Sequence, residues 1–186
     1  MTRAEKISGG AVLLLLALAS LLLLIQHITL ARYRAAPTAL QIEEIRVPVQ
    51  GVARDDLVDT WGAARAGGRT HEGIDIIAPQ GTPVLAATDG RIASLMNNTR
   101  GGVAIYQFDQ DQNYVFYYAH LQRRAPGLDE GDAVREGQVI GYVGSTGNAT
   151  TPHLHFELHR LDGETKYWQG EAVNPYPYLL SGEAPQ

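Results

Sequence analysis

The chain has 186 residues, no cysteine and a formal net charge of −5 at pH 7. This length allows one domain of ordinary size with short additions. The lack of cysteine excludes a disulfide framework and thiolate metal ligands. The acidic balance, with no basic stripe along the sequence, argues against a nucleic-acid partner.

Residues 9–31 form a long apolar stretch near the N-terminus. A leucine-rich run with interspersed Gly, Ala and Ser fills it, and Arg3 and Lys6 precede it. Its length is close to the ~20 residues that a helix needs to cross a bilayer. We therefore expect an uncleaved transmembrane signal anchor at 9–31, with residues 1–8 as a cytoplasmic tip. A cleaved signal peptide is the alternative.

The remainder of the chain predicts a folded domain between two less regular segments. Residues 32–50 mix polar and apolar side chains and are expected to be a connector, and residues 179–186 are expected to be a flexible tail. Short strands broken by glycine-rich turns are expected at 84–87, 90–95, 102–108, 114–121, 133–134, 139–143 and 153–159. This pattern predicts a mostly β domain at 51–178, a compact antiparallel sheet folded as a sandwich or a rolled sheet.

Four of the six histidines lie in three short motifs. The motifs are His71-Glu-Gly-Ile-Asp75, Tyr118-Ala-His120-Leu and His153-Leu-His155. In extended chain His71 and Asp75 share one face, because side chains alternate with a period of two, and His153 and His155 share a face likewise. Glu72 alternates away from that face.

Two imidazoles and one carboxylate, with a fourth position left open, are typical of a catalytic zinc site. Two further histidines are suited to acid–base chemistry. The pattern therefore predicts a metal-dependent hydrolase. The motif H-E-x-x-H, in which the glutamate acts as general base, is absent. No glutamate is therefore placed to act as the base in that manner.

Together these motifs resemble those of the lysostaphin-type or LytM-domain zinc endopeptidases, which cut peptide cross-links in bacterial peptidoglycan. The resemblance covers about residues 51–178 and rests on the segments 59–62, 69–76, 78–84, 118–121, 131–141, 144–148 and 152–158. It implies one Zn²⁺ ion held by His71, Asp75 and His155. It also implies catalysis by His120 and His153, without deciding which histidine is the base and which stabilises the oxyanion.

The resemblance further implies a membrane-anchored endopeptidase that acts on peptidoglycan peptides, with its domain in the periplasm or outside the cell. A non-catalytic wall-binding or hydrolase-activating module of the same fold is the alternative. The scissile bond stays open between a D-Ala–diamino acid linkage and a polyglycine bridge. Nothing in the sequence identifies protein partners.

Weaker candidates for substrate contacts surround the histidine motifs. We expect them at Arg69, Tyr118, Asn148 and Thr150. A packed strand tyrosine is the alternative for Tyr118, and turn formation is the alternative for the two loop residues. His159 is expected at the surface, where the last strand ends.

Overall fold

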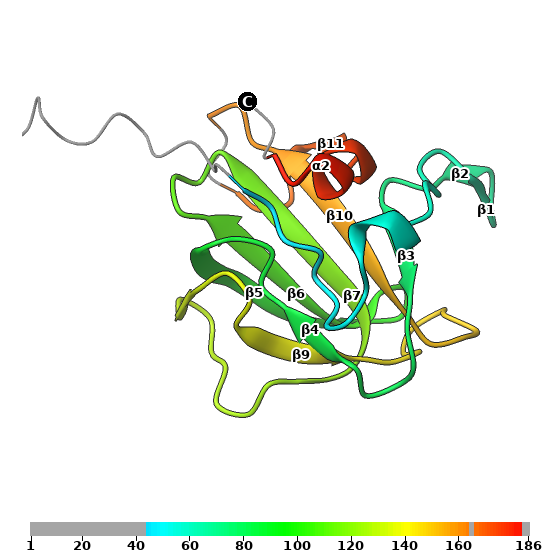
Figure 1. Cartoon of the computed structure of the whole chain (residues 1–186), viewed down its shortest axis with the longest axis horizontal. Coiled ribbons are helices and arrows are strands. Elements are labelled where there is room, and N and C mark those ends of the chain that lie inside the picture. Colours follow the sequence, from blue (N-terminus) through cyan, green and yellow to red (C-terminus); the bar gives the residue numbers. More distant parts are fainter. Residues whose placement is uncertain (1–43, 164–165, 184–186) are drawn as a thin grey trace, which may run out of the picture. The chain divides into compact units, whose positions relative to one another are not determined.

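The computed structural model describes residues 44–163 and 166–183, which fold around one antiparallel sheet (Figure 1). The strands are β1 (Ala64–Arg65), β2 (Arg69–Thr70), β3 (Ile74–Ile77), β4 (Pro83–Leu85), β5 (Gly90–Asn98), β6 (Gly102–Asp109), β7 (Tyr114–Arg124), β8 (Ala133–Val134), β9 (Val139–Val143), β10 (His153–Arg160) and β11 (Glu171–Val173). The helices are the 3-10 turn η1 (Arg54–Asp56) and α2 (Tyr176–Ser181).

The main sheet has the strand order β11-β10-β7-β6-β5-β8. Strands β5, β6, β7 and β10 are its long members and run side by side in Figure 1. The short strand β3 pairs with the beginning of β10, and β9 bridges β4 to the end of β7. Strands β1 and β2 form a separate two-stranded hairpin that precedes β3.

The hydrophobic core covers one face of this sheet. Phe116, Tyr118, Leu154, Phe156 and Leu158 alternate along β7 and β10 and are fully buried. Aromatic and aliphatic side chains at every second position are what a half-covered sheet requires. A smaller cluster on the sheet, made of Ala104, Tyr117 and Ala119 with Tyr106 against it, is separate from this core.

The mostly β antiparallel fold expected from the sequence is confirmed. The expected strands all have counterparts, because alternation and glycine turns are local signals that survive in the folded chain. The sequence did not predict the 3-10 turn η1, the β1–β2 hairpin, β11 or helix α2. Each is very short or lies in a segment without clear periodicity.

Both ends of the described part pack more closely than expected. Ile45, Val47 and Val49 alternate into the core, so the last residues of the expected connector belong to the domain. Helix α2 runs into the expected tail, and its Leu179 is fully buried. The expectation of a loose segment is therefore wrong for the described part of that tail, because Leu179 supplies a buried contact.

The expected anchor at 9–31 lies outside the described residues. Within residues 44–163 and 166–183, no helix has the length and apolarity to span a bilayer.

Candidate metal centre and active-site pocket

Strand pairing brings the three proposed ligands together. Asp75 on β3 lies directly opposite His155 on β10, and His71 sits just before β3. Gly73 makes this close approach feasible, since a Cβ atom there would lie 2.4 Å from the carbonyl oxygen of Phe156. The absence of a side chain at Gly73 therefore lets the backbone of β10 lie against this segment.

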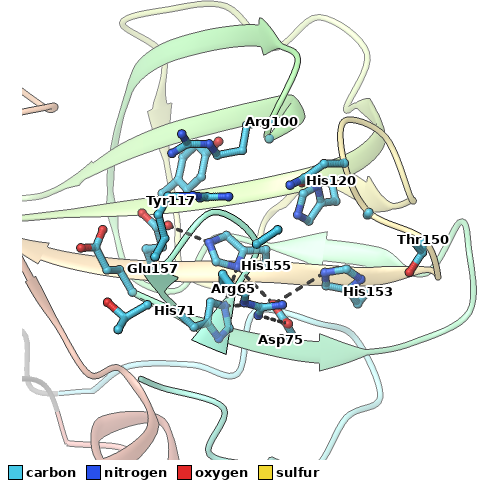
Figure 2. Close-up of a pocket in the computed structure, with 17 residues that line it drawn as sticks. Arg65, His71, Asp75, Arg100, Tyr117, His120, Thr150, His153, His155 and Glu157 are labelled. Atoms are coloured by element: carbon cyan, nitrogen blue, oxygen red, sulfur yellow. Dashed lines mark hydrogen bonds and ion pairs between the residues drawn. The ribbon is translucent and has the colours of Figure 1, made fainter. Parts of the chain in front are cut away.

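The three donor atoms form a compact triangle (Figure 2). His71 Nε2 lies 2.8 Å from His155 Nδ1 and 3.2 Å from Asp75 Oδ1, and His155 Nδ1 lies 3.1 Å from Asp75 Oδ1. Zinc bonds of 2.0–2.2 Å in a tetrahedron would separate such donors by about 3.3 Å. The observed triangle and its nitrogen and oxygen chemistry therefore fit a zinc-type ion with a fourth position left open.

Neighbouring groups hold each proposed ligand in the right orientation. His71 Nδ1 donates to the carbonyl oxygen of Thr60 at 2.7 Å, which fixes the ring with Nε2 directed toward the other donors. The Thr60 hydroxyl also accepts from the backbone N–H of Asp75 at 2.9 Å. Thr60 lies in the Asp59–Gly62 segment of the sequence resemblance, but no role was predicted for it.

Glu157 orients the other imidazole. Its Oε1 lies 2.7 Å from His155 Nε2, and its Oε2 lies 2.7 Å from His159 Nε2. His159 is therefore a half-buried member of this network, and the expectation that it lies free at the surface is wrong. The period-two alternation 155, 157, 159 along β10 was the signal that would have identified this network.

Hydrogen bonds set the charges of these groups in the metal-free protein. Burial raises the pKa of Asp75, but hydrogen bonds from His155, His71 and Arg65 outweigh it and hold that pKa far below its usual range. Burial opposes a charged His155, yet its bonds to Asp75 and Glu157 raise its pKa to about 9. A metal ion must therefore displace a proton from His155 at neutral pH.

His120 and His153 stand beside the donor triangle. The centroids of their rings are 4.9 Å apart, and the His120 ring is 5.7 Å from that of His155. His120 Nδ1 donates to the carbonyl oxygen of Thr146, and His153 Nδ1 to that of Thr151, both at 2.8 Å. Burial lowers the pKa of His120 to about 4, so this imidazole is neutral at pH 7.

An irregularity in β7 places His120 in the pocket. Strand β7 carries one extra residue opposite β6 between Tyr118 and Leu121, and His120 has a left-handed φ of 62°. The extra residue interrupts the alternation, so Tyr118 and His120 do not share a face as expected. Tyr118 is fully buried, and its hydroxyl donates to Gln107 Oε1 at 2.7 Å and accepts from the Ala87 N–H at 3.0 Å.

The expectation that Tyr118 contacts substrate is therefore wrong, and its neighbour Tyr117 faces the pocket instead. The pocket is an open cavity of about 290 Å³ above the donor triangle. Arg69, Asn148 and Thr150 line it as predicted, and Arg65, Arg100 and Glu72 line it as well. Glu72 was expected to turn away from the metal face; it is exposed at the pocket wall and outside the donor triangle.

Comparison with known proteins places this site in a family. The model of Peptidase family M23 matches residues 69–175. The chain belongs to peptidase family M23. The match runs from β2 to just before α2. It therefore includes the three proposed ligands and the two neighbouring histidines, which are His71, Asp75, His155, His120 and His153.

Individual M23 relatives cover parts of the chain. Over 133 residues it is 38% identical to the L-Ala–D-Glu endopeptidase of Bacillus subtilis, which is 67% of this chain and 39% of that relative. Over 90 residues it is 42% identical to the peptidoglycan DD-endopeptidase ShyC of Vibrio cholerae, which is 48% of this chain and 20% of that relative. The chain thus spans well under two thirds of these relatives.

A solved structure has a similar fold. The fold resembles a zinc-containing peptidase from Vibrio cholerae with a TM-score of 0.56 and 29% identity, over 64% of this chain and 37% of that one.

Proposed function

We propose that the protein is a zinc-dependent endopeptidase that hydrolyses peptide bonds in bacterial peptidoglycan. The observation that carries this proposal is the triangle of His71, Asp75 and His155 donors beside two histidines that are outside it. Membership of family M23 supports the reaction class. The similarity to ShyC, a peptidoglycan DD-endopeptidase, supports peptidoglycan as the substrate. The similarity to a zinc-containing peptidase supports zinc as the metal.

One zinc ion is expected in the site. When bound, zinc acts as a Lewis acid that makes water nucleophilic near neutral pH and polarises a carbonyl group. The protein's own contribution is to hold three ligands in one geometry, leave the fourth position open to the pocket and place proton-transfer groups beside it.

His120 is the better candidate for the general base. Its Nδ1 proton is held by the Thr146 carbonyl, and burial keeps the ring neutral, so the Nε2 lone pair is free to accept a proton from the attacking water. The proton then becomes available to the leaving amine, since hydrolysis adds one water across the carbon–nitrogen bond.

His153 is the better candidate for the oxyanion donor. Its Nδ1 faces the Thr151 carbonyl, and its Nε2 lies 3.6 Å from Asp75 Oδ1. Both ring nitrogens thus face oxygen atoms. A donor at Nε2 stabilises the negative charge that develops as the scissile carbonyl becomes tetrahedral.

Peptidoglycan lies outside the cytoplasmic membrane, so the domain is proposed to work in the periplasm or at the outer surface. The apolar stretch at 9–31 is proposed to anchor it, with residues 32–44 as the connection to the domain. N-terminal sequencing of the membrane and soluble fractions tests the anchor. A soluble mature protein that begins after residue 25 would refute it.

Digestion of defined muropeptides by the zinc-loaded full chain, followed by mass spectrometry, tests the proposed activity. New fragments should differ from their parent by one water per cut, and removal of zinc should abolish them. If no muropeptide is cut while zinc is bound at full occupancy, the enzyme assignment fails.

A further inference from the structure

The pocket above the metal centre is less acidic than the chain as a whole, because three arginines balance its three carboxylates. Arg65, Arg69 and Arg100 line it, in a chain whose formal net charge is −5. Two of its three carboxylates are already engaged, since Asp75 is bonded to His71, His155 and Arg65, and Glu157 to His155 and His159. Glu72 is the remaining acid of the lining.

Two of these arginines lie in the β1–β2 hairpin, where their direct pairing does not stabilise the fold. Arg65 and Arg69 are direct cross-strand partners in a hairpin with two residues in each strand. Like charges directly opposite each other destabilise an antiparallel pair. Arg65 forms an ion pair with Asp75, whereas Arg69 is exposed and forms no ion pair with any described residue. An anionic ligand would relieve this repulsion.

Arg100 contributes the third guanidinium from a firmly held turn between β5 and β6. Its N–H donates to Asn98 Oδ1 at 3.0 Å, and its carbonyl oxygen accepts from the Asn148 N–H at 3.0 Å. The adjacent Gly101 carbonyl accepts from the His120 N–H at 2.7 Å. The backbone that carries Arg100 is therefore joined to the loop and the histidine of the active site.

The Arg100 side chain is available for a ligand. It is exposed and forms no ion pair within residues 44–163 and 166–183. In Figure 2, Arg100 and the Arg65–Asp75 pair appear on opposite sides of His155. Guanidinium groups bind carboxylates through two parallel hydrogen bonds, which fixes orientation as well as charge.

We propose that Arg69 and Arg100 form a carboxylate-binding subsite, and that the substrate is a stem peptide with free carboxylates rather than a neutral glycine bridge. This inference rests on the proposed peptidoglycan endopeptidase function and specifies its substrate class. The carboxylate belongs either to the γ-linked glutamate or to the diamino acid of the stem. Both offer the same chemistry to a guanidinium.

The test compares peptides that differ only in charge. The zinc-loaded full chain is given stem peptides with both carboxylates free, with only the glutamate carboxylate amidated, and with only the diamino acid amidated, together with a pentaglycine-bridged peptide. The wild type should cleave the fully free peptide about 10–100-fold more efficiently in kcat/KM than the form whose recognised carboxylate is amidated. The amidated form that shows this loss identifies which carboxylate is bound.

Arg69→Gln, Arg100→Gln and the double variant should bring the ratio of kcat/KM for free and amidated peptides toward one. Arg135→Gln is the matched control, because it removes one exposed charge outside the pocket and should keep the wild-type ratio. A wild-type ratio of one or less, a ratio unaffected in the double variant, or faster cleavage of the glycine bridge would overturn the subsite.

Failure of the proposed function would look different, because no peptide would then be cleaved at all. In that case calorimetric titration of the same peptides into the zinc-loaded protein still decides the matter. Tighter binding of the free form, lost in the double variant, supports the subsite, and equal binding of the free and amidated forms overturns it.

Discussion

Glu157→Gln should weaken zinc binding through His155 without removing a ligand. The carboxylate lies 2.7 Å from His155 Nε2, and its own pKa is held at about 2 because bonds from His155 and His159 outweigh the effect of burial. Glu157 is therefore charged throughout the accessible pH range. Glutamine has the same shape, and its one carbonyl oxygen can still accept the hydrogen bond from His155, so toward this ligand the change removes mainly the charge.

Two opposing effects determine the size of the change. In the metal-free wild type the His155 pKa is about 9, so at pH 7 a proton must be displaced and the apparent zinc affinity is reduced about 100-fold. Loss of the Glu157 charge lowers this proton competition. It also makes the imidazole a weaker and less well oriented ligand, which typically reduces metal affinity 10–100-fold.

The pH dependence separates the two effects. The zinc affinity of the wild type should rise about tenfold per pH unit and level off near pH 9. Below that pH the proton on His155 competes with zinc, and above it the imidazole is already deprotonated. The affinity of the variant should level off at a lower pH, because its His155 pKa is lower, and its plateau should be about 10–100-fold lower. At pH 7 the two effects partly cancel, so a comparison at one pH would mislead.

Competition against a chromophoric zinc chelator between pH 6 and 9.5 measures both quantities. Glu72→Gln is the matched control, because it removes an exposed carboxylate of the same pocket that forms no hydrogen bond or ion pair with a proposed ligand. A Glu157→Gln plateau within about twofold of wild type would refute the orienting role of Glu157. An equal loss in Glu72→Gln would show a general charge effect instead.

Three further outcomes are expected. Alanine at any one of the three proposed ligands should empty the site, because three ligands leave no redundancy, and full zinc occupancy by metal analysis would exclude that residue as a ligand. His120→Ala and His153→Ala should keep zinc, but the rate should fall by about 10²–10⁴ for the first and about 10²–10³ for the second. The two losses should not add in the double variant, and Arg135→Gln serves as the control. Near-full activity in both single variants would contradict the two-histidine mechanism. Tyr118→Phe should lower the free energy of unfolding by about 1–3 kcal/mol in urea titrations, because Gln107 Oε1 and the Ala87 N–H lose a buried partner, while turnover persists.

Local patterns in the sequence were sufficient for the strands and for the set of histidines. Alternation and glycine turns predict strands because each depends on a few neighbouring residues. The convergence of His71, Asp75 and His155 agrees with the expectation from the motifs, although their roles as ligands stay a prediction. Pairing of β3 with β10 puts Asp75 opposite His155, and this register depends on contacts between segments about 80 residues apart.

The orienting groups could not be predicted in the same way. Thr60 and Arg65 reach Asp75 from a turn and a two-residue strand that lack any periodicity. Glu157 could have been identified, because it shares the face of His155, but its bond to His159 depends on side-chain positions. Tyr118 was misplaced because the extra residue in β7 leaves no mark in the hydrophobic pattern.

That extra residue also explains why a non-glycine residue with a left-handed φ is retained at the active site. The conformation of His120 costs of the order of 1–2 kcal/mol for a residue with a side chain. Its N–H bond to Gly101 and its ring bond to Thr146 offset this cost and hold the imidazole in one place. In regular alternation position 120 would fall on the face of Tyr118, which is the core face. The irregularity instead turns His120 toward His153 and keeps Tyr118 in the core, so a single backbone feature separates the proposed proton-transfer group from a packing group two residues away.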